Sequence, residues 1–461
     1  MRILLIAADN DAYMHSFPLG IAYIASTLLK NDYEVVIYNQ DMNHYSDRHL
    51  TIYLNNNKFD VVGVGFVAGY YQYKKIKKIS KSISQSKNRP FYIIGGHGPS
   101  PEPEYFMKKL EADVVVLGEG EATIVDLLYA LSTNKPLMNV RGIAFSNGTE
   151  VVINKRRPTI ENIDDIPMPA YHLFPLEYYR LTRKPKSEAA DLTMNILSAR
   201  GCHYHCNFCY RMDKGYRTRS NESIIDEVKY LQLEYGINYI AFVDECLLSS
   251  IQRTESLCED IIKAKLHIKW LCGGRLNYAK PDLLKLMKTA GCVYISYGIE
   301  CLDDAILKTM GKGLTTEMIR NGIKATLKAG ISPGFNIIFG NIGETKEILN
   351  RGVEFLLKYD DGADLRTIRP VIPYPGSPLY YKAIENGLLK DCEDFYENKH
   401  VNSDLLTVNF TDLSDEEFHE SLWVANSKLI DNYFTKKKDV ALKEIRKLYF
   451  EKNTTFRGFR H

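Results

Sequence analysis

The chain has 461 residues, of which 45% are hydrophobic and 25% charged, an ordinary composition for a globular protein with room for two or three domains. Its net charge of +2 argues against a large nucleic-acid interface, and its odd number of cysteines, nine, argues against a disulfide framework. Because no stretch of about 18 apolar residues is present and the amino terminus lacks the layout of a signal peptide, we expect a cytoplasmic protein without membrane or nucleic-acid partners.

Residues 1–140 alternate short apolar runs with amphipathic helical stretches. The expected strands are Arg2–Ala8, Glu34–Tyr38, Asp60–Phe66, Phe91–Gly95 and Asp113–Leu117. The expected helices are Gly20–Lys30, Tyr70–Ser84, Glu104–Lys109 and Glu121–Ser132. Short buried strands separated by helices are typical of a doubly wound parallel sheet, so we expect an α/β domain of the Rossmann-like type.

Four loops of this region follow predicted strands, at the edge where parallel sheets bind their ligands. They read DNDAYMHSFPLG, GFVAGYY, GGHGPSPEPE and GEGEAT. Their glycines would let a bulky ligand approach the backbone closely. No G-x-G-x-x-G follows the first strand and no P-loop pattern is present, so the sequence does not predict a nicotinamide site.

Residues 141–190 have a different character and are expected to form a linker or arm. RGIAFSNGTEVVI predicts a small hairpin that turns at Asn147-Gly148, a strong two-residue turn signal. The following ENIDDIPMPAYHLFPLEYY is rich in proline, which disfavours a long helix.

Residues 191–380 contain a second series of strand and helix patterns. The expected strands are Thr193–Ser198, Tyr239–Val243, Lys269–Gly273, Val293–Ile299, Pro333–Phe339 and Leu365–Val371. The expected helices include Ser220–Tyr235, Ser249–Ala264, Pro281–Ala290 and Thr316–Gly330. Six such units predict a partial (β/α)6 barrel resembling a TIM barrel, with its active residues at the carboxyl ends of the strands.

Residues 381–461 are charged and are expected to be helical. One helix is expected to begin after Ser414, because Glu417 three residues later completes the pattern of a capping box.

Three cysteines, Cys202, Cys206 and Cys209, stand at spacing C-x3-C-x2-C just after the first predicted barrel strand. A structural zinc site needs four ligands, and His203 and His205 are too close to their neighbouring cysteines to complete a tetrahedron easily. Three unconnected buried thiols are a further alternative. The pattern favours a [4Fe–4S] cluster held by three thiolates, which leaves one iron free to chelate a substrate.

The segment CHYHCNFC resembles the cysteine loop of the radical S-adenosylmethionine superfamily. The resemblance implies that the fourth iron binds the amino and carboxylate groups of S-adenosylmethionine. An electron from the cluster would then cleave the sulfonium and release a 5′-deoxyadenosyl radical. Phe208 matches the family's aromatic residue that contacts adenine, and Tyr210 is expected beside it.

Later strand ends extend this resemblance along the barrel. They suggest S-adenosylmethionine contacts by Asp244 and Glu245 in FVDE, Arg275 in GGRLN, Glu300 in GIE and Gly340 in FNIIFGNIGET. The family has two glycines and a glutamate where this chain has Asp244-Glu245, so the sequence departs from the pattern at that point.

The first region resembles the cobalamin-binding domain that precedes such barrels in enzymes similar to the anaerobic magnesium-protoporphyrin ester cyclase and the class B C-methyltransferases. PLGIAYIASTL, GGHGPSPEP, VVVLGEGEAT and DDIPMPA carry this resemblance. The cobalamin contacts that it implies are Leu19, Gly20, Gly65, Phe66, Val67, Ala68, Gly95, Gly96, His97, Gly118, Glu119 and Gly120.

The D-x-H-x-x-G signature of histidine-ligated cobalamin is absent, so no histidine ligand to cobalt is expected. We interpret His97 as a hydrogen-bonding loop residue and expect Val67 or Ala68 nearest the metal. A degenerate domain without cobalamin remains the alternative.

Together the resemblances imply an enzyme that abstracts a substrate hydrogen and transfers a methyl group from methylcobalamin to carbon. A small-molecule or natural-product-type substrate and an electron donor such as flavodoxin or ferredoxin would be its partners. Two alternatives stay open. One keeps the cofactors but performs oxidative cyclisation, ring contraction or rearrangement, and the other is a non-catalytic cobalamin or iron–sulfur sensor.

Overall fold

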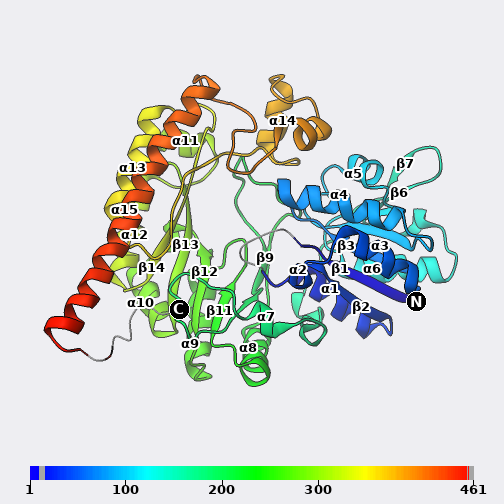
Figure 1. Ribbon diagram of the computed structural model, residues 1–461, viewed down its shortest axis with the longest axis horizontal. Coiled ribbons are helices and arrows are strands. Elements are labelled where there is room, and N and C mark those ends of the chain that lie inside the picture. Colours follow the sequence, from blue (N-terminus) through cyan, green and yellow to red (C-terminus); the bar gives the residue numbers. More distant parts are fainter. Residues whose placement is uncertain (10–15, 454, 456–461) are drawn as a thin grey trace.

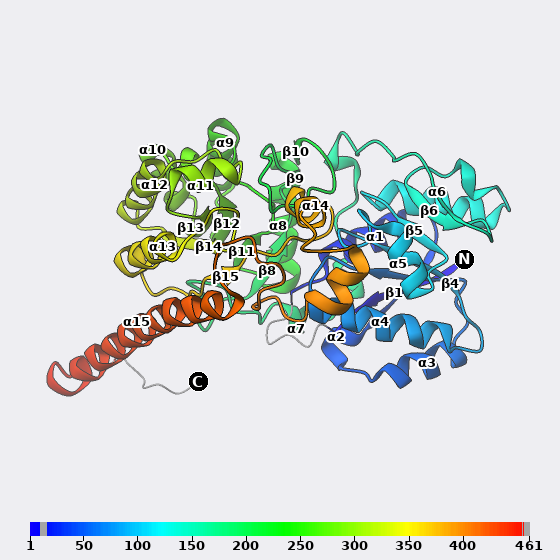
Figure 2. The same cartoon turned by 90° about the horizontal axis from the view of Figure 1, so that it is seen from above.

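A computed structural model describes residues 1–9, 16–453 and 455 of the chain. The expectation for the loop DNDAYMHSFPLG therefore falls partly outside the described residues, because residues 10–15 are not described. The described chain forms a seven-stranded sheet, a six-stranded sheet and a two-stranded ribbon. Figures 1 and 2 show the two large sheets side by side with the ribbon between them.

The seven-stranded sheet has the order β2-β1-β3-β4-β5-β6-β7, and its first five strands are parallel. This order confirms the doubly wound fold and puts a topological switch point between β1 and β3. The parallel strands are β1 (Arg2–Ala7), β2 (Glu34–Asn39), β3 (Val61–Gly65), β4 (Phe91–Gly95) and β5 (Val114–Val116). The surrounding helices are α1 (Leu19–Lys30), α2 (Gln40–Asn43), α3 (Asp47–Asn56), α4 (Tyr70–Ser84), α5 (Pro103–Leu110) and α6 (Glu121–Ser132).

Helix α3 lies in a segment for which the sequence predicted no element. Its sequence DRHLTIYLNN is mostly polar, and only Leu50 and Leu54, one turn apart, are buried. Ser46 caps its amino terminus by accepting a hydrogen bond from the backbone N–H of His49. With two core residues in ten, the apolar period was too weak to distinguish a helix from a loop.

The hairpin at Asn147-Gly148 forms as expected, from β6 (Ile143–Ser146) and β7 (Val151–Ile153). It falls within the segment that the sequence assigned to an arm, yet β6 pairs antiparallel with β5 and so extends the first sheet. The chain then runs through short turns, η2 (Ile163–Asp165), η3 (Tyr171–Leu173) and α7 (Leu176–Tyr179), toward the second sheet.

The six-stranded sheet is parallel throughout and has the order β15-β14-β13-β12-β11-β8, which confirms the partial barrel. Its strands are β8 (Thr193–Ile196), β11 (Tyr239–Phe242), β12 (Lys269–Gly274), β13 (Cys292–Glu300), β14 (Ser332–Phe339) and β15 (Arg369–Pro370). Its helices are α8 (Asn221–Tyr235), α9 (Ile251–Lys263), α10 (Pro281–Thr289), α11 (Asp304–Thr309), α12 (Thr316–Lys328) and α13 (Lys346–Tyr359).

The last strand is much shorter than the predicted Leu365–Val371. Ile368, just before it, donates its backbone N–H to the side-chain oxygen of Asn426 at 2.7 Å and accepts from the amide of Asn426 at 3.0 Å. A side chain of a later helix therefore takes the hydrogen bonds that a longer strand would have given to β14.

The carboxy-terminal region contacts both domains. Helix α14 (Pro378–Glu385) and the π-helix Asp394–Lys399 add side chains to the core of the first domain. Helix α15 (Asp415–Phe450) starts with the expected capping box at Ser414 and packs on α13. No helix among the described residues is long and apolar enough to cross a membrane.

Candidate active site between the two domains

The three-cysteine loop is closed by the ribbon of β9 (Ala199–Gly201) and β10 (Tyr216–Thr218), which begins shortly after β8. Gly201 has a φ of +84°, and a Cβ there would lie 2.3 Å from the carbonyl oxygen of Gly215. Only glycine fits this closure, which returns the loop to its starting point and holds its thiols at the carboxyl end of the barrel.

The start of the loop is fixed by Asp244, which follows β11. One carboxylate oxygen accepts from the backbone N–H groups of Ser198 and Ala199 at 2.6 and 3.1 Å, and the other accepts from the Ser198 hydroxyl. Arg253 donates to the Ser198 carbonyl oxygen at 3.0 Å. Both oxygens of Asp244 therefore bind the chain that leads into the cysteine loop. Glu245 is exposed and has Arg211 and Asp213 as charged neighbours.

A buried ion pair lies beside the loop. Lys312 Nζ is 2.7 Å from Glu300 Oε1, and their side chains are only 7% and 8% exposed. Glu300 ends β13 with a φ of +64°, a left-handed conformation that is uncommon outside glycine and points to a constrained site. A Cβ at Gly298 would lie 2.5 Å from the Glu300 carboxylate, so the pair occupies space that this glycine leaves open.

Arg275 joins this ion pair to the loop. Its guanidinium donates to the Lys312 carbonyl oxygen and lies 3.4 Å from the centre of the Tyr204 ring. Lys312 Nζ lies 5.9 Å from the ring of Phe208. Arg275 Nε is buried and has no hydrogen-bond partner among the described residues, so it is a donor available to a bound group.

The positive charges of Lys312 and Arg275 affect the pKa of a cysteine in the loop. A hydrogen bond from Cys209, aided by the positive charges of Lys312 and Arg275, lowers the pKa of Cys206 to about 6, while the same hydrogen bond raises the pKa of Cys209. All nine cysteines of the chain are free thiols. Cys206 and Cys209 lie together beside Lys312 and Arg275, but the part of the chain that the structure describes contains no three ligands already gathered around one metal position. Thiols beside two cations, one of which has an unsatisfied N–H, have the chemistry that suits an anionic iron–sulfur cluster and a ligand with a carboxylate.

The loop after β14 is tied to the cysteine loop. The Gly340 and Asn341 N–H groups donate to one oxygen of Glu344, each at 2.8 Å. The Asn341 side chain exchanges hydrogen bonds of 3.0 Å with Asn207, which lies between Cys206 and Phe208. Gly340 has a φ of +103°, and a Cβ there would lie 2.8 Å from the ring of Phe418 on α15.

The cysteine loop also contacts the first domain. The Tyr210 ring lies 6.4 Å from the ring of His97 in the loop after β4, and a Cβ at Gly376 would lie 2.5 Å from the Tyr210 ring. A Cβ at Gly118, after β5, would lie 3.3 Å from Asp213. Burial lowers the pKa of His97. The structure thus brings the two predicted cofactor regions to one place.

Buried ion pairs connect the domains next to this contact. Glu119 Oε1 is 2.9 Å from Arg200 and 3.0 Å from Arg217, on opposite strands of the ribbon, and Glu121 is 2.6 Å from Arg200. Glu119 also accepts from the backbone N–H of Ile160 at 2.8 Å. Burial acts to raise the pKa of Glu119, but the hydrogen bonds from Arg217 and Arg200 hold it below its ordinary value. We call these residues the interdomain clamp.

The residues expected to contact cobalamin lie at the carboxyl edge of the first sheet and at the start of α1. Phe66 differs from the rest because its side chain is fully buried in the core, 5.4 Å from the ring of Phe106. Val67 is exposed, and the Val67 and Ala68 N–H groups both donate to Gln72. The others are Leu19 and Gly20 on α1, Gly65, Gly95, Gly96 and His97 at the ends of β3 and β4, and Gly118, Glu119 and Gly120 after β5.

Several residues of the site were not predicted: Tyr204, Lys312, Asn341, Glu344 and the clamp arginines. The sequence held one indication of Lys312, which stands between two glycines in the segment GKG just after the helix that follows β13. No local pattern indicated Arg200 and Arg217, because Glu119, with which they pair, lies 81 and 98 residues away from them in the sequence.

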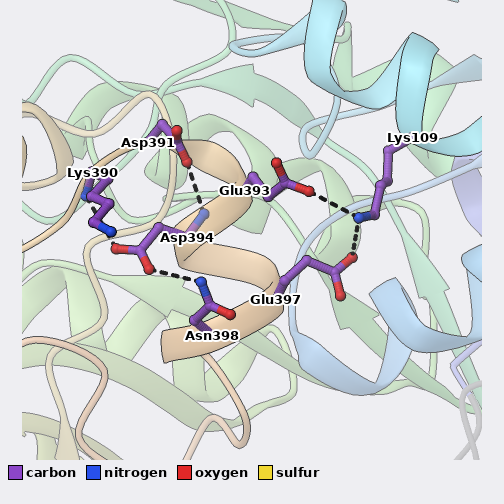
Figure 3. A pocket seen from close by; sticks show the side chains of 7 residues that line it. All are labelled: Lys109, Lys390, Asp391, Glu393, Asp394, Glu397 and Asn398. Atoms are coloured by element: carbon purple, nitrogen blue, oxygen red, sulfur yellow. Dashed lines mark hydrogen bonds and ion pairs between the residues drawn. The ribbon is translucent and has the colours of Figure 1, made fainter.

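Two pockets of the molecule lie apart from this site. Figure 3 shows one of about 350 Å³ between α5 and the π-helix, where Lys109 binds Glu393 and Glu397 at 3.1 and 3.0 Å. The other, of about 430 Å³, lies at the amino-terminal end of the barrel, beside Lys265 and Lys269.

Comparison with known protein families shows that each of the two domains matches one family. Residues 196–356 match the radical SAM superfamily and residues 6–128 match the B12 binding domain. An uncharacterized methyltransferase of Pyrococcus horikoshii is 30% identical over 400 residues, which cover 84% of each chain. The anaerobic magnesium-protoporphyrin IX monomethyl ester cyclase of Cereibacter sphaeroides is 27% identical over 79% of this chain and 60% of that protein.

The fold is also that of a solved structure. The radical S-adenosylmethionine methyltransferase TsrM of Kitasatospora setae, solved with cobalamin and a [4Fe–4S] cluster, superposes with a TM-score of 0.71 at 17% identity, over 92% of this chain and 89% of that one. The two domain matches, the order of the domains and the relative at 30% identity agree. The chain therefore belongs to the cobalamin-binding radical S-adenosylmethionine enzymes.

Proposed function

We propose that this enzyme methylates an unactivated carbon of a small-molecule substrate. The observation that carries the proposal is the contact between Tyr210, next to Cys209, and His97, in the first domain. A cluster in the cysteine loop and a cobalamin at the first sheet would then share one space, in which a substrate carbon could meet both. The relative from Pyrococcus horikoshii, which is named a methyltransferase, supports this choice.

In this proposal Cys202, Cys206 and Cys209 ligate three irons, and S-adenosylmethionine chelates the fourth. The free Nε of Arg275 would bind its carboxylate, because a guanidinium pairs well with that group. Glu300, fixed by Lys312, would accept hydrogen bonds from its amino group or ribose.

The remaining expected contacts complete the proposed site. Phe208 and the backbone at Gly340 would contact adenine, with Tyr210 and Glu245 at its margin. Asp244 would act by positioning the loop, because both of its carboxylate oxygens already accept hydrogen bonds from the chain.

A cluster held by Cys202, Cys206 and Cys209 would pass one electron from a protein donor such as flavodoxin or ferredoxin to S-adenosylmethionine, whose sulfonium–C5′ bond would break to give methionine and a 5′-deoxyadenosyl radical. That radical takes a hydrogen atom from the substrate and leaves as 5′-deoxyadenosine. A cobalamin held at the loops after β3, β4 and β5 would supply the methyl group, with one electron, for the new carbon–carbon bond, and a second S-adenosylmethionine with reductant would remethylate it. The chain's own residues bind and orient these groups and exclude water.

The test uses the anaerobically reconstituted enzyme with S-adenosylmethionine labelled in its methyl group. We expect 5′-deoxyadenosine in the presence of a reductant and the label in a product when candidate small molecules are supplied. Iron and cobalt analysis should show a cluster that is lost in Cys202→Ser, Cys206→Ser and Cys209→Ser but kept in Cys258→Ser, whose thiol is buried elsewhere in the barrel. Cleavage of S-adenosylmethionine with no label in any product would contradict methylation.

The relative from Cereibacter sphaeroides favours a second candidate, oxidative cyclisation with the same cofactors. That reaction would form a ring in the substrate without incorporating the label. The same assay therefore separates the two, because cyclisation changes the product mass by loss of hydrogen and methylation adds a methyl group.

We also infer a reducing, cytoplasmic setting, since cluster ligation needs free thiolates and the chain holds nine free cysteines.

A further inference from the structure

Tyr204, which stands between Cys202 and Cys206, lies against the side chain of Arg275. The central carbon of the guanidinium is 3.4 Å from the centre of the Tyr204 ring, a distance of direct van der Waals contact. The two residues belong to different parts of the barrel, because Arg275 follows β12 whereas Tyr204 lies in the cysteine loop between β9 and β10. The contact therefore ties the cysteine loop to the end of β12.

Two residues that closely follow Arg275 hold the tyrosine ring in place. The side-chain amide of Asn277 donates to the Tyr204 hydroxyl at 3.3 Å, and this hydroxyl donates to the hydroxyl of Tyr278 at 3.0 Å. Both partners lie in the short 3-10 turn η4 (Leu276–Tyr278), for which Arg275 is the amino-terminal cap. The turn that carries the guanidinium thus also fastens the ring that lies over it.

The guanidinium of Arg275 is buried and still has a donor to offer. Arg275 is only 5% exposed, and its Nη2 donates to the carbonyl oxygen of Lys312. Its Nε is buried and has no hydrogen-bond partner in the part of the chain that the structure describes. Glu300, the buried carboxylate nearby, forms its ion pair with Lys312. Because a buried donor without a partner costs free energy, an incoming carboxylate that accepts from this Nε would be bound favourably.

The orientation of the guanidinium decides how well it can bind such a group. All of its N–H groups lie in one plane, so they point correctly only if that plane is held. An arginine side chain that is free to turn loses rotamer freedom when it binds, and this loss weakens the complex. At Arg275 the Tyr204 ring covers one face of the plane and the Lys312 carbonyl holds one end of it. The Nε donor is therefore oriented before a ligand arrives.

We propose that Tyr204 is a positioning residue that orients the Nε of Arg275 toward the carboxylate of S-adenosylmethionine. The inference rests on the proposed function, in which Arg275 binds that carboxylate. The effect of Tyr204 passes through Arg275, so it depends on a carboxylate in the ligand and on an arginine at position 275. A tyrosine that only stabilised the cysteine loop would affect every ligand of the site alike.

The experiment measures binding of two ligands to the full-length, anaerobically reconstituted enzyme by equilibrium dialysis. They are S-adenosylmethionine and decarboxylated S-adenosylmethionine, which keeps the sulfonium, the adenosine and the amino group. We expect Tyr204→Leu to weaken binding of S-adenosylmethionine about tenfold and to leave binding of the decarboxylated ligand within about twofold. Tyr204→Phe keeps a ring over the guanidinium and should bind S-adenosylmethionine within about threefold of the unchanged enzyme.

Two further variants serve as a control and as a second probe. His205→Leu is the matched control, because His205 is an exposed neighbour of Tyr204 in the same loop and should leave binding of both ligands unchanged. Tyr278→Phe lies outside the loop and removes the hydroxyl that accepts from Tyr204, so it should weaken S-adenosylmethionine alone, by about threefold. Iron content and the electron paramagnetic resonance spectrum of the reduced cluster without ligand should match the unchanged enzyme in each variant.

Arg275→Leu separates this inference from the proposed function. It should weaken binding of S-adenosylmethionine at least about tenfold, and adding Tyr204→Leu to it should weaken binding no further. Equal weakening of both ligands by Tyr204→Leu, or an undiminished further loss in the double variant, overturns the positioning role and leaves the assignment of Arg275 in place. Unchanged binding in Arg275→Leu overturns that assignment and this inference with it. Neither result bears on methylation, which the labelled product decides.

Discussion

The pair of Lys312 and Glu300 is the most enclosed pair of opposite charges beside the cysteine loop. Removing one partner of a buried ion pair leaves the other charge unpaired, which costs about 3–5 kcal/mol. We therefore expect Lys312→Ala to lower the free energy of unfolding by about 3 kcal/mol and to weaken binding of S-adenosylmethionine. Lys308→Ala, an exposed lysine on α11, should change neither by more than about 0.5 kcal/mol. Urea unfolding and equilibrium dialysis measure the two quantities.

His400 gives the fold a dependence on pH. Its ring is fully buried, stacks on Phe395 at 4.9 Å and bonds Thr407 through Nδ1. Burial lowers the pKa of His400 from 6.5 to about 4. The unfolded chain binds a proton at this histidine more readily than the folded chain does. The neutral ring therefore makes its full contribution to the free energy of unfolding above about pH 6.5. That contribution, about 3 kcal/mol, is lost as the pH falls toward 4.

His400→Phe keeps an aromatic ring and removes this titration. We expect its free energy of unfolding to fall less steeply than that of the unchanged enzyme between pH 7 and pH 4.5, as measured by urea unfolding. His172→Phe, an exposed histidine, should keep the original slope. Equal slopes for His400→Phe and the unchanged enzyme would show that His400 does not control this range.

At the scale of elements, the interdomain clamp holds the β9–β10 ribbon against the loop after β5. Glu119→Gln would remove the carboxylate that two partly buried arginines share, and we expect the free energy of unfolding to fall by about 2–4 kcal/mol. The loop between Cys209 and Gly215 should then be cut faster by trypsin. Glu150→Gln, an exposed control, should leave both unchanged. Unchanged stability and cleavage in Glu119→Gln would mean that the clamp is not needed to hold the ribbon.

Local patterns predicted most of the elements and the cysteine loop. Cys202, Cys206 and Cys209 lie within eight consecutive residues, so their spacing could be read directly, and the apolar runs of β1 to β5 predicted the parallel part of the first sheet. Contacts that depend on distant partners could not be read in this way. The shortening of β15 depends on Asn426, 58 residues away from Ile368.

At the scale of the whole molecule, the carboxy-terminal region completes the core of the first domain. Tyr396 of the π-helix stacks on Tyr73 at 4.5 Å and contacts Phe66 and Phe106. Truncating a large buried aromatic side chain costs about 3–5 kcal/mol. We expect Tyr396→Ala to destabilise the first domain by that amount and to weaken retention of cobalamin, since Phe66 directly precedes the loop at Val67.

The comparison for this variant is Tyr381→Ala, whose ring on α14 is half exposed. Urea unfolding followed by tyrosine fluorescence, and cobalt content after gel filtration, measure the two effects. An equal change in both variants would mean that the packing of Tyr396 adds nothing specific to the first domain.

This packing has a consequence for synthesis. During synthesis the first domain leaves the ribosome before residues 394–400 do. Until these residues follow, the apolar surface around Phe66 and Phe106 that they cover in the folded protein would be exposed to solvent. We expect chains interrupted before residue 394 to be held by chaperones or to aggregate, even though every strand of the first sheet is already present.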